Sequence, residues 1–322
     1  MKLAKSVGGA EPLPPLRWPA PLVGEDLVSV ADLTTDEVWF LLDLAARVKA
    51  QPGRYRHALE RKTLAMLFEK PSLRTRVTFQ VAMEQLGGHA IYLGPEEVGL
   101  GKREAVKDVA HNLSCWVDAV VARVRSHATV EQLAEHAQVP VINGLSDFEH
   151  PCQALGDYLT LLEHRHRPSE TLLAWVGDGN NVCHSLIYGA ARTGVNMRIA
   201  TPAGYEPEAR VVEEARAHGA HLELTHDPFE AVAGADAVYT DVWVSMGQEG
   251  AAETRRKVFL PYQVNARLMA RAGEDALFMH CLPARRGEEV TDEVIDSPHS
   301  LVCQQAQNRL HIQKAILLAL LA

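Results

Sequence analysis

Short apolar runs rich in branched residues alternate with stretches of helical periodicity along most of this chain. In LTTDEVWFLLDLAARVKA, capping residues precede apolar positions at helical spacing, which predicts a helix from about Thr35. The runs that follow are almost continuously hydrophobic, as strands buried on both faces of a sheet are. The predicted strands form a first set at 63–70, 89–95, 118–124 and 139–146, and a second at 171–179, 196–202, 221–227, 235–244, 276–283 and 300–305.

Strand, helix and strand at this spacing predict parallel α/β units with right-handed crossovers. Because the helical stretch HPCQALGDYLTLLEH separates the two sets, we predict an α/β fold of two doubly wound domains with mainly parallel sheets, joined by inter-domain helices. The domains are expected at 22–153 and 154–306, with a C-terminal helix at 307–322 that packs back on the first domain. Residues 1–21 hold five prolines and are expected to form a flexible extension. In such folds ligands bind at the carboxyl ends of the strands.

Composition excludes several classes of protein. A net charge of −9 argues against bulk nucleic-acid binding, so any bound anion needs a local cluster of cations. Five cysteines without a C-x-x-C motif fit a reducing cytosol and indicate no disulfide framework or zinc knuckle. No apolar run reaches the roughly 20 residues that span a bilayer, and the start of the chain lacks the apolar core of a signal peptide. His164 and His166 are interpreted as a polar helix end rather than a metal pair. We expect a cytoplasmic protein without a membrane segment or metal.

A cluster of cations follows the first predicted strand. Pro71 breaks the strand, and Ser72 is placed to cap the next helix. Arg74 and Arg76 then fall in its first turn, where the helix dipole favours negative charge. The free amides of that turn, the hydroxyls of Ser72 and Thr75, and the guanidinium of Arg74 could converge on a phosphate. We therefore interpret this turn as an anion site rather than only a capped helix with a basic first turn.

The ends of the third and fourth strands carry weaker signals. Arg123 ends the third strand, where a single arginine is usually a surface residue. His150 and Gln153 stand at the start of the helix between the two sets. His150 could donate to a carbonyl oxygen, and Gln153 could both donate and accept. A lone histidine before proline is more often structural, and the local pattern leaves both interpretations open.

In the second set, WVGDGNNVCHS resembles a phosphate-binding turn but lacks the third glycine of the dinucleotide fingerprint. The next strand ends in Thr201 and Pro202 rather than an acid, so the pattern disfavours a nicotinamide cofactor. Asn181 remains as a polar group at a strand end. Asp241 ends a later strand, just before the small turn SMG, and an acid there suits an ammonium group.

The stretch MHCLPARRG ends an apolar run with the thiol of Cys281 beside two arginines. Cys281 is either an ordinary buried cysteine next to a surface loop or a group that faces an anionic substrate. The first domain thus offers a phosphate site, and the second offers an acid, an amide and a thiol. This division indicates transfer from a phosphorylated donor to an amine.

Four motifs together resemble the ornithine branch of the carbamoyltransferases: SLRTR, HPCQ, DVWVSMG and HCLP, in this order. The resemblance runs from about Leu22 to the C-terminus, and the last two motifs separate this branch from the aspartate enzymes. It implies transfer of the carbamoyl group of carbamoyl phosphate to the δ-amine of L-ornithine, giving L-citrulline and phosphate in arginine biosynthesis. It also implies no cofactor, a homotrimer or a multiple of trimers, and a cis peptide before Pro283.

The resemblance assigns a role to each matched residue. Carbamoyl phosphate would be held by Ser72, Leu73, Arg74, Thr75, Arg123, His150, Pro151, Cys152, Gln153, Cys281, Leu282 and Arg309. Ornithine would be held by Asn181, Asp241, Ser245 and Met246. The catalytic groups would be Arg74, Arg123, His150, Asp241 and Cys281. In this interpretation Cys281 acts with Asp241 to place and help deprotonate the amine, and is not a covalent nucleophile.

Three positions depart from the family pattern. Leu73 replaces a threonine of many members, Cys152 fills a variable position, and Gly99 stands where some members have a glutamine beside a loop that reaches a neighbouring subunit. Two alternatives stay open: a carbamoyltransferase for putrescine or an N-acylated ornithine, and a nucleotide-binding oxidoreductase, which the glycine pattern disfavours. The biosynthetic or degradative direction also stays open.

Overall fold

The computed structural model describes residues 22–244 and 249–322. The expected flexible extension at 1–21 therefore lies outside the described residues. The chain divides into two compact units. Unit 1 contains residues up to Leu159 together with Asn308–Ala322, and unit 2 contains Thr160–Gln307. The helices α6 (Pro151–His164) and α13 (Val302–Leu321) each begin in one unit and end in the other.

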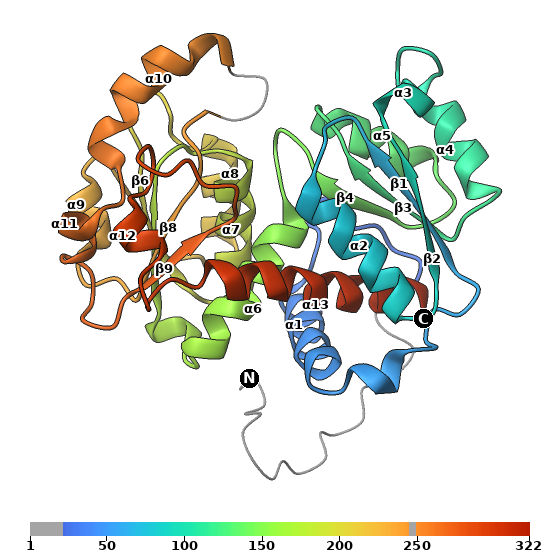
Figure 1. The fold of residues 1–322 in the computed structure, drawn as a ribbon, viewed down its shortest axis with the longest axis horizontal. Coiled ribbons are helices and arrows are strands. Elements are labelled where there is room, and N and C mark those ends of the chain that lie inside the picture. The colour runs from blue at the N-terminus through green and yellow to red at the C-terminus, as the bar shows by residue number, and fades with distance from the viewer. Residues whose placement is uncertain (1–21, 245–248) are drawn as a thin grey trace. The chain divides into compact units, whose positions relative to one another are not determined.

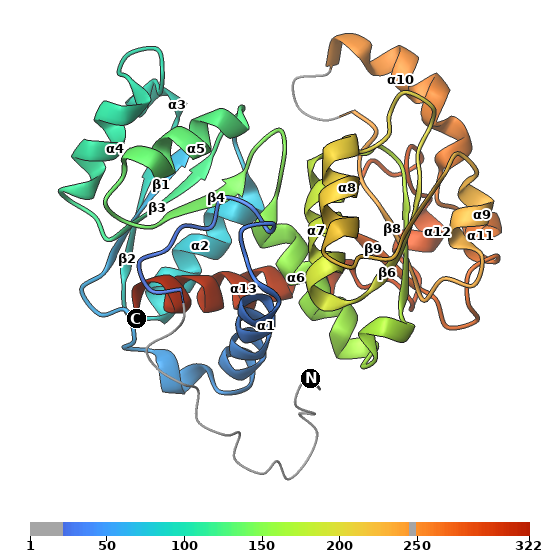
Figure 2. The same ribbon diagram turned by 180° about the vertical axis from the view of Figure 1, so that it is seen from behind.

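Unit 1 contains a parallel sheet whose described strands run in the order β2-β1-β3-β4. These strands are β1 (Thr63–Phe68), β2 (His89–Leu93), β3 (Ala119–Arg123) and β4 (Val141–Leu145). The helices of this unit are α1 (Thr35–Ala50), α2 (Leu73–Gln85), α3 (Pro95–Val98), α4 (Val106–Ser114) and α5 (His127–His136). Figures 1 and 2 show α2 on one face of the sheet and α4 and α5 on the other. Both faces are covered, which explains why β3 is buried at every position.

The first helix begins where the sequence predicts it. Thr34 is the N-cap of α1 and accepts a hydrogen bond from the backbone N–H of Glu37, while the Glu37 carboxylate accepts from the N–H of Thr34. This capping box satisfies two amides that the first turn leaves open. The apolar residues Val38, Leu41 and Leu44 of α1 are fully buried.

Unit 2 repeats the plan with a second parallel sheet, described in the order β7-β6-β5-β8-β9. Its strands are β5 (Leu172–Val176), β6 (Asn196–Ala200), β7 (Leu222–Thr225), β8 (Ala237–Thr240) and β9 (Leu277–His280). Its helices are α7 (Asn181–Thr193), α8 (Ala209–Ala217), α9 (Pro228–Val232), α10 (Ala252–Phe259), α11 (Ala266–Met269) and α12 (Asp292–Ile295). In Figure 1, α7 and α8 lie on one face of this sheet, and α9, α11 and α12 lie on the other. The predicted fold class, two parallel-sheet α/β domains, is confirmed.

The strand expected at 300–305 is wrong. Ser300 forms a single parallel bridge with Phe278, and α13 begins two residues later at Val302. The run SLVCQQ is apolar over too few residues to separate a strand from a helix, and the residues after it continue the helical period. The C-terminal helix therefore starts five residues before the expected 307. Its later part packs in unit 1, where the carbonyl of Leu320 accepts a hydrogen bond from the N–H of Gly24.

The expectation about membranes can be examined for the described part of the chain. There, no helix combines the length and the apolar character that a bilayer crossing needs.

Candidate active site

The order of the strands places one switch point in each sheet. In unit 1 the chain leaves β1 toward β2 on one side, whereas β3 and β4 lie on the other side, so the order reverses between β1 and β3. Ligands of open parallel sheets bind outside the carboxyl ends of the strands at such a point. Phe68 at the end of β1 pairs with Arg123 at the end of β3. The segment that carries Ser72 and Arg74 follows β1 directly, so the cationic turn and Arg123 come from the two strands of this switch point.

The start of α2 has the capped form that the sequence predicts. The hydroxyl of Ser72, in extended conformation at the N-cap, accepts a hydrogen bond from the N–H of Thr75 at 3.2 Å. A serine cap of this kind stabilises a helix by about 1 kcal/mol. Arg74 is half-buried in the first turn, and Leu73 is exposed. Arg76 lies elsewhere: its guanidinium carbon is 3.7 Å from the centre of the Tyr92 ring, which gives it a cation–π partner.

Arg309 of α13 connects three of the sequence-predicted residues within unit 1. One guanidinium nitrogen donates to the side-chain oxygen of Gln153, and the other terminal nitrogen donates to the hydroxyl of Thr75 at 3.3 Å. The Gln153 amide in turn donates to the Asp157 carboxylate at 2.8 Å. Arg309, Gln153 and Thr75 are all buried. A buried arginine held on two sides by polar side chains presents a fixed positive charge, which suits an anionic ligand.

His150 is buried close to this charge. Burial lowers the pKa of its imidazole well below the ordinary value, and the positive charges of Arg309 and Arg123 lower it further. The pKa of Lys70 is also lowered, first by burial and then by the charges of Arg123 and Arg125. These shifts indicate that positive charge accumulates at this edge of the sheet. His150 is therefore neutral near neutral pH, and a neutral imidazole offers one N–H donor.

Two further predicted residues lie in the first turn of α6. Pro151 is the first residue of this helix, where proline removes an amide that has no partner within the helix. Cys152 is fully buried, and its thiol donates to the carbonyl of Asn143 at 3.6 Å. Burial raises the pKa of this thiol to about 12. Cys152 thus remains a neutral thiol, bonded to a backbone carbonyl.

The switch point of unit 2 lies between β5 and β8, because β6 and β7 lie on one side of β5 and β8 and β9 on the other. The segment after β5 carries Asn180 and Asn181, and Asp241 follows β8 directly. The structure joins these two segments, since the side-chain amide of Asn180 donates to the Asp241 carboxylate at 2.8 Å. Asn180 also caps α7 by accepting from the amides of Val182 and Cys183. Asn180, the neighbour of the predicted Asn181, is therefore a further candidate at this switch point.

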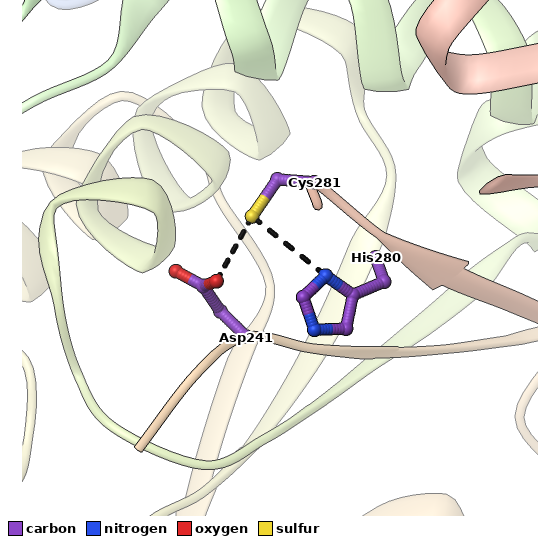
Figure 3. Close-up of side chains that lie close together, drawn as sticks. All are labelled: Asp241, His280 and Cys281. Carbon is purple, nitrogen blue, oxygen red and sulfur yellow. Dashed lines mark hydrogen bonds between the residues drawn. The ribbon is translucent and has the colours of Figure 1, made fainter. Parts of the chain in front are cut away.

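Cys281 follows the adjacent strand, β9, and its thiol lies against Asp241 (Figure 3). The sulfur is 3.0 Å from Oδ1 of Asp241, and the same oxygen accepts from the N–H of Val242 at 2.8 Å. Asn180 donates to the other oxygen, so Asn180, Val242 and Cys281 all donate to Asp241 and this carboxylate acts as an acceptor. Cys281 is half-buried, and so it is not an ordinary core cysteine.

The loop after Cys281 has an unusual backbone. Leu282 has φ of 58°, in the left-handed region, and the Leu282–Pro283 peptide is cis, as the resemblance implies. A residue other than glycine in this region costs roughly 1–2 kcal/mol. The N–H of Leu282 donates to Nδ1 of His280 at 2.9 Å, and Nε2 of His280 lies 3.1 Å from the Glu289 carboxylate. A buried imidazole and a buried carboxylate therefore support the segment that carries Cys281.

Asp241, His280 and Cys281 could also be read as metal ligands, because one ligand atom from each lies within 4.8 Å of the others. However, Nδ1 of His280, the atom nearest the sulfur in Figure 3, already accepts the N–H of Leu282. A metal on that nitrogen would displace this backbone hydrogen bond. The group therefore fits a hydrogen-bonded thiol–carboxylate pair more closely than a preformed metal site.

Sequence reasoning missed several polar residues of unit 2. Besides Asn180, they include the buried pair of Asp178 with Arg255, and of His280 with Glu289. Burial raises the pKa of Asp178 to about 6, although the Arg255 guanidinium 2.5 Å away opposes this. His280 lies in the HCLP motif at the end of a predicted strand, so the argument that identified Cys281 as a candidate also applies to it. Local sequence does not predict the burial of Asp178, Arg255 or Glu289, because it depends on how the chain folds between the partners, which are 77 and 9 positions apart. The predicted Ser245 and Met246 lie outside the described residues.

Comparison with known proteins agrees with this geometry. Residues 25–163 match the carbamoyl-P binding domain of the aspartate/ornithine carbamoyltransferases, and residues 169–320 match their Asp/Orn binding domain. The chain belongs to the aspartate/ornithine carbamoyltransferase family. The first match covers most of unit 1 and the second covers most of unit 2, together with residues 308–320 of unit 1. The ends of β1 and β3 therefore lie in the carbamoyl-P binding domain, and the ends of β5 and β8 lie in the Asp/Orn binding domain.

Relatives within the family are ornithine carbamoyltransferases. The enzyme of Pyrococcus horikoshii is 53% identical over 306 residues, which cover 93% of this chain and 96% of that protein. The enzyme of Archaeoglobus fulgidus is 54% identical over 297 residues, covering 92% and 97%. Among solved structures, the ornithine carbamoyltransferase of Pyrococcus furiosus has a TM-score of 0.90 at 52% identity and covers 93% of this chain and 97% of its own. The identity and coverage confirm the ornithine branch that the four motifs indicate.

Proposed function

We propose that this chain transfers the carbamoyl group of carbamoyl phosphate to the δ-amine of L-ornithine, giving L-citrulline and phosphate. The observation that carries the proposal is the pairing of opposite chemistries in a member of this family. Unit 1 gathers Arg309, Arg123 and the start of α2 at its switch point, and unit 2 gathers Asp241, Cys281 and Asn180. The first set suits a phosphorylated donor and the second suits an amine.

Carbamoyl phosphate would bind through unit 1. The phosphate would take the positive N-terminal end of α2, where Ser72 caps the amide of Thr75, and the guanidinium of Arg74. Arg309 and Arg123 would stabilise the charge that grows on the phosphate as it leaves. Neutral His150 would donate one N–H to the carbamoyl oxygen. A neutral donor suits this task, since it binds the oxygen without repelling the nearby arginines.

Ornithine would present its amine to the thiol and carboxylate of unit 2. A free alkylamine resembles lysine, whose pKa is about 10.4, so it must lose a proton before it can attack. Asp241, fixed by Cys281, Val242 and Asn180, offers an acceptor for an amine proton. In the transfer, the amine lone pair forms a bond to the carbamoyl carbon, the bond from that carbon to the phosphate oxygen breaks, and the electron pair leaves with phosphate. Asp241 takes the first amine proton before the attack and later returns it to solvent, and the second proton, released as the new bond forms, passes to the phosphate or to solvent.

The identity of the amine is tested by comparing substrates. Initial rates with carbamoyl phosphate and either L-ornithine, putrescine or N-acetylornithine give three values of kcat/KM. Free ornithine should exceed both alternatives by at least about 100-fold, because buried polar groups left without their substrate partners are costly. A higher value for putrescine or for N-acetylornithine would reassign the amine. Titration with NADH, followed by its fluorescence, should show no saturable binding.

Three finer assignments belong to the same proposal. The Pyrococcus furiosus relative, 53% identical, is called anabolic, which supports a biosynthetic role in arginine formation for this chain as well. We also propose a cytoplasmic homotrimer or a multiple of trimers. Sedimentation equilibrium of the purified protein gives the mass directly, and a monomeric or dimeric mass in the presence of carbamoyl phosphate would contradict the trimer.

A further inference from the structure

The segment that holds Cys281 is supported by Glu289, which lies nine residues after His280 and pairs with it. Both Glu289 and His280 are fully buried, with exposed fractions of 0%. A carboxylate in such a position is costly unless its hydrogen bonds repay the loss of water. Oε1 of Glu289 lies 3.1 Å from Nε2 of His280 and accepts the backbone N–H of Arg285 at 2.5 Å. The residue is therefore engaged on the inner side of the Cys281 loop.

The backbone of Glu289 is fixed independently of these contacts. Its carbonyl accepts the N–H of Val264 at 2.8 Å, and the N–H of Thr291 donates back to the carbonyl of Val264 at 3.1 Å. Val264 and Val290 form a parallel bridge and are fully buried. Glu289 thus projects from a turn whose backbone is tied to Val264 on either side of the Val290 bridge, and its carboxylate can determine where His280 points.

The tautomer of His280 follows from its neighbours. The N–H of Leu282 can only donate, so Nδ1 of His280 must carry its lone pair toward it. The ring proton is therefore on Nε2, where it points to the Glu289 carboxylate. Glu289 and Leu282 together hold the ring in one orientation and one tautomer.

Glu289 and His280 influence the Cys281 thiol through two successive contacts. His280 accepts the N–H of Leu282, whose φ of 58° is sterically unfavourable and needs such support. The same turn directs the Cys281 thiol to Asp241, 3.0 Å away. The thiol lies 4.0 Å from Nδ1, a nitrogen already committed to Leu282, so His280 orients the turn and does not serve as the base for the thiol.

We propose that Glu289 is a positioning residue for carbamoyl transfer: it accepts the Nε2–H of His280, and this imidazole holds Cys281 and Leu282 in the orientation that places the amine. The inference rests on the proposed function. Its requirement is an acceptor at the correct distance, not a negative charge as such.

Three variants separate an acceptor from a charge. Glu289→Gln keeps the length and an acceptor oxygen, and its amide group takes the place of Oε2, which has no hydrogen-bond partner among the described residues. Glu289→Asp keeps the charge but withdraws the acceptor from His280. Glu289→Met keeps the length and removes both. Glu288→Gln is the matched control, because Glu288 lies on the same turn and pairs with Arg256 and Arg285 instead.

The measurement is kcat and KM for citrulline formation by each full-length variant. Asp and Met at 289 should lower kcat by about 10- to 100-fold, the range seen when outer hydrogen-bond partners of active-site groups are removed. The KM for carbamoyl phosphate should change by no more than about threefold. Gln at 289 and Gln at 288 should both retain kcat within about threefold of the wild type. Equal losses for Gln and Asp at 289, or wild-type kcat in Asp and Met, would overturn the proposal.

A double variant shows whether Glu289 acts through His280. If it does, adding Glu289→Asp to His280→Asn should cause no further loss of kcat, because the interaction is already gone. Additive losses would contradict the inference.

Nitrogen-15 spectra of labelled histidine give a readout independent of activity. The signals of the His280 ring are assigned by their absence in His280→Asn. They should show the Nε2–H tautomer in wild type and Glu289→Gln, and a changed pattern in Glu289→Asp. An unchanged pattern there would also contradict it. If the wild type forms no citrulline at all, the proposed function fails instead.

Discussion

The two units share one architecture and differ in the charge that they place at the switch point. In unit 1, the strands β1 and β3 lead to the start of α2 and to Arg123, with Arg309 nearby. In unit 2, the equivalent strands β5 and β8 lead to Asn180 and Asp241. We propose that the parallel sheet decides where a ligand binds, and that a few side chains decide whether this ligand is an anion or an amine. Variants that alter one site and spare the other test this division.

The largest effect is expected for Arg74 on the phosphate side. Arg74→Ala should lower kcat/KM for carbamoyl phosphate by about 1,000-fold, because a charged contact to phosphate is lost. This factor corresponds to a loss of about 4 kcal/mol of binding free energy in the transition state. Arg76→Ala is the matched control from the same turn, and its partner is the Tyr92 ring. Steady-state kinetics on both variants give the comparison. Similar losses in the two would refute the specific assignment of Arg74.

On the amine side, Asp241→Asn should lower kcat by about 100-fold, because the proton acceptor for the amine is removed. The affinity for carbamoyl phosphate should stay near that of the wild type, since Asp241 belongs to unit 2. Equilibrium binding of carbamoyl phosphate, measured by calorimetry in the absence of ornithine, checks the second expectation. A large loss of that affinity would remove the distinction between the two units.

A smaller effect, up to about tenfold in kcat, is expected for Cys281→Ser, because a hydroxyl can still donate to Asp241 and only a modest hydrogen bond is altered. The same variant addresses the chemistry of the thiol. Intact-mass spectrometry of the wild type, quenched during turnover, should show no added carbamoyl group. A carbamoylated protein, absent in Cys281→Ser, would replace direct transfer with a covalent intermediate.

The smallest effect concerns stability and pH. The folded-state pKa of His150 lies well below that of the unfolded chain, so below about pH 6.5 the unfolded state binds the additional proton. Above that pH, the contribution of His150 to the free energy of unfolding is fully present. As the pH falls below it, this contribution is lost by at most about 1.4 kcal/mol per pH unit. His150→Gln should reduce this slope in urea unfolding between pH 6.5 and 5. An unchanged slope would show that His150 is not buried as a neutral group.

Much of the fold and part of the site follow from local sequence. The parallel strands can be predicted because strands buried on both faces appear as continuous apolar runs in the sequence. The cap at Ser72 can be predicted because a serine side chain bonds to an amide only three residues ahead of it. Asp241 and Cys281 were identified because strand ends in such folds carry ligands, and the structure brings them within 3.0 Å. The prediction of a strand at 300–305 was wrong because the periodicity of so short an apolar run does not distinguish a strand from a helix.

Other features depend on contacts between distant residues. Glu289 and Arg255 are charged residues in polar stretches, where the sequence predicts solvent exposure. Both are nevertheless buried: Glu289 pairs with His280, 9 positions away, and Arg255 pairs with Asp178, 77 positions away. Asn180 and Asn181 are adjacent and identical, so only the direction of the Asn180 side chain reveals its bond to Asp241. Tertiary structure decides such pairings, and they lie next to the groups proposed to react.

We propose that one set of residues activates carbamoyl phosphate and that the other set delivers the amine to it directly. The most direct test is the ratio of citrulline to phosphate formed by the wild-type protein from L-ornithine and carbamoyl phosphate, corrected for the spontaneous breakdown of carbamoyl phosphate. Direct transfer predicts one citrulline for each phosphate released, and no enzyme-dependent phosphate release when ornithine is omitted. Enzyme-dependent phosphate release without citrulline would contradict it.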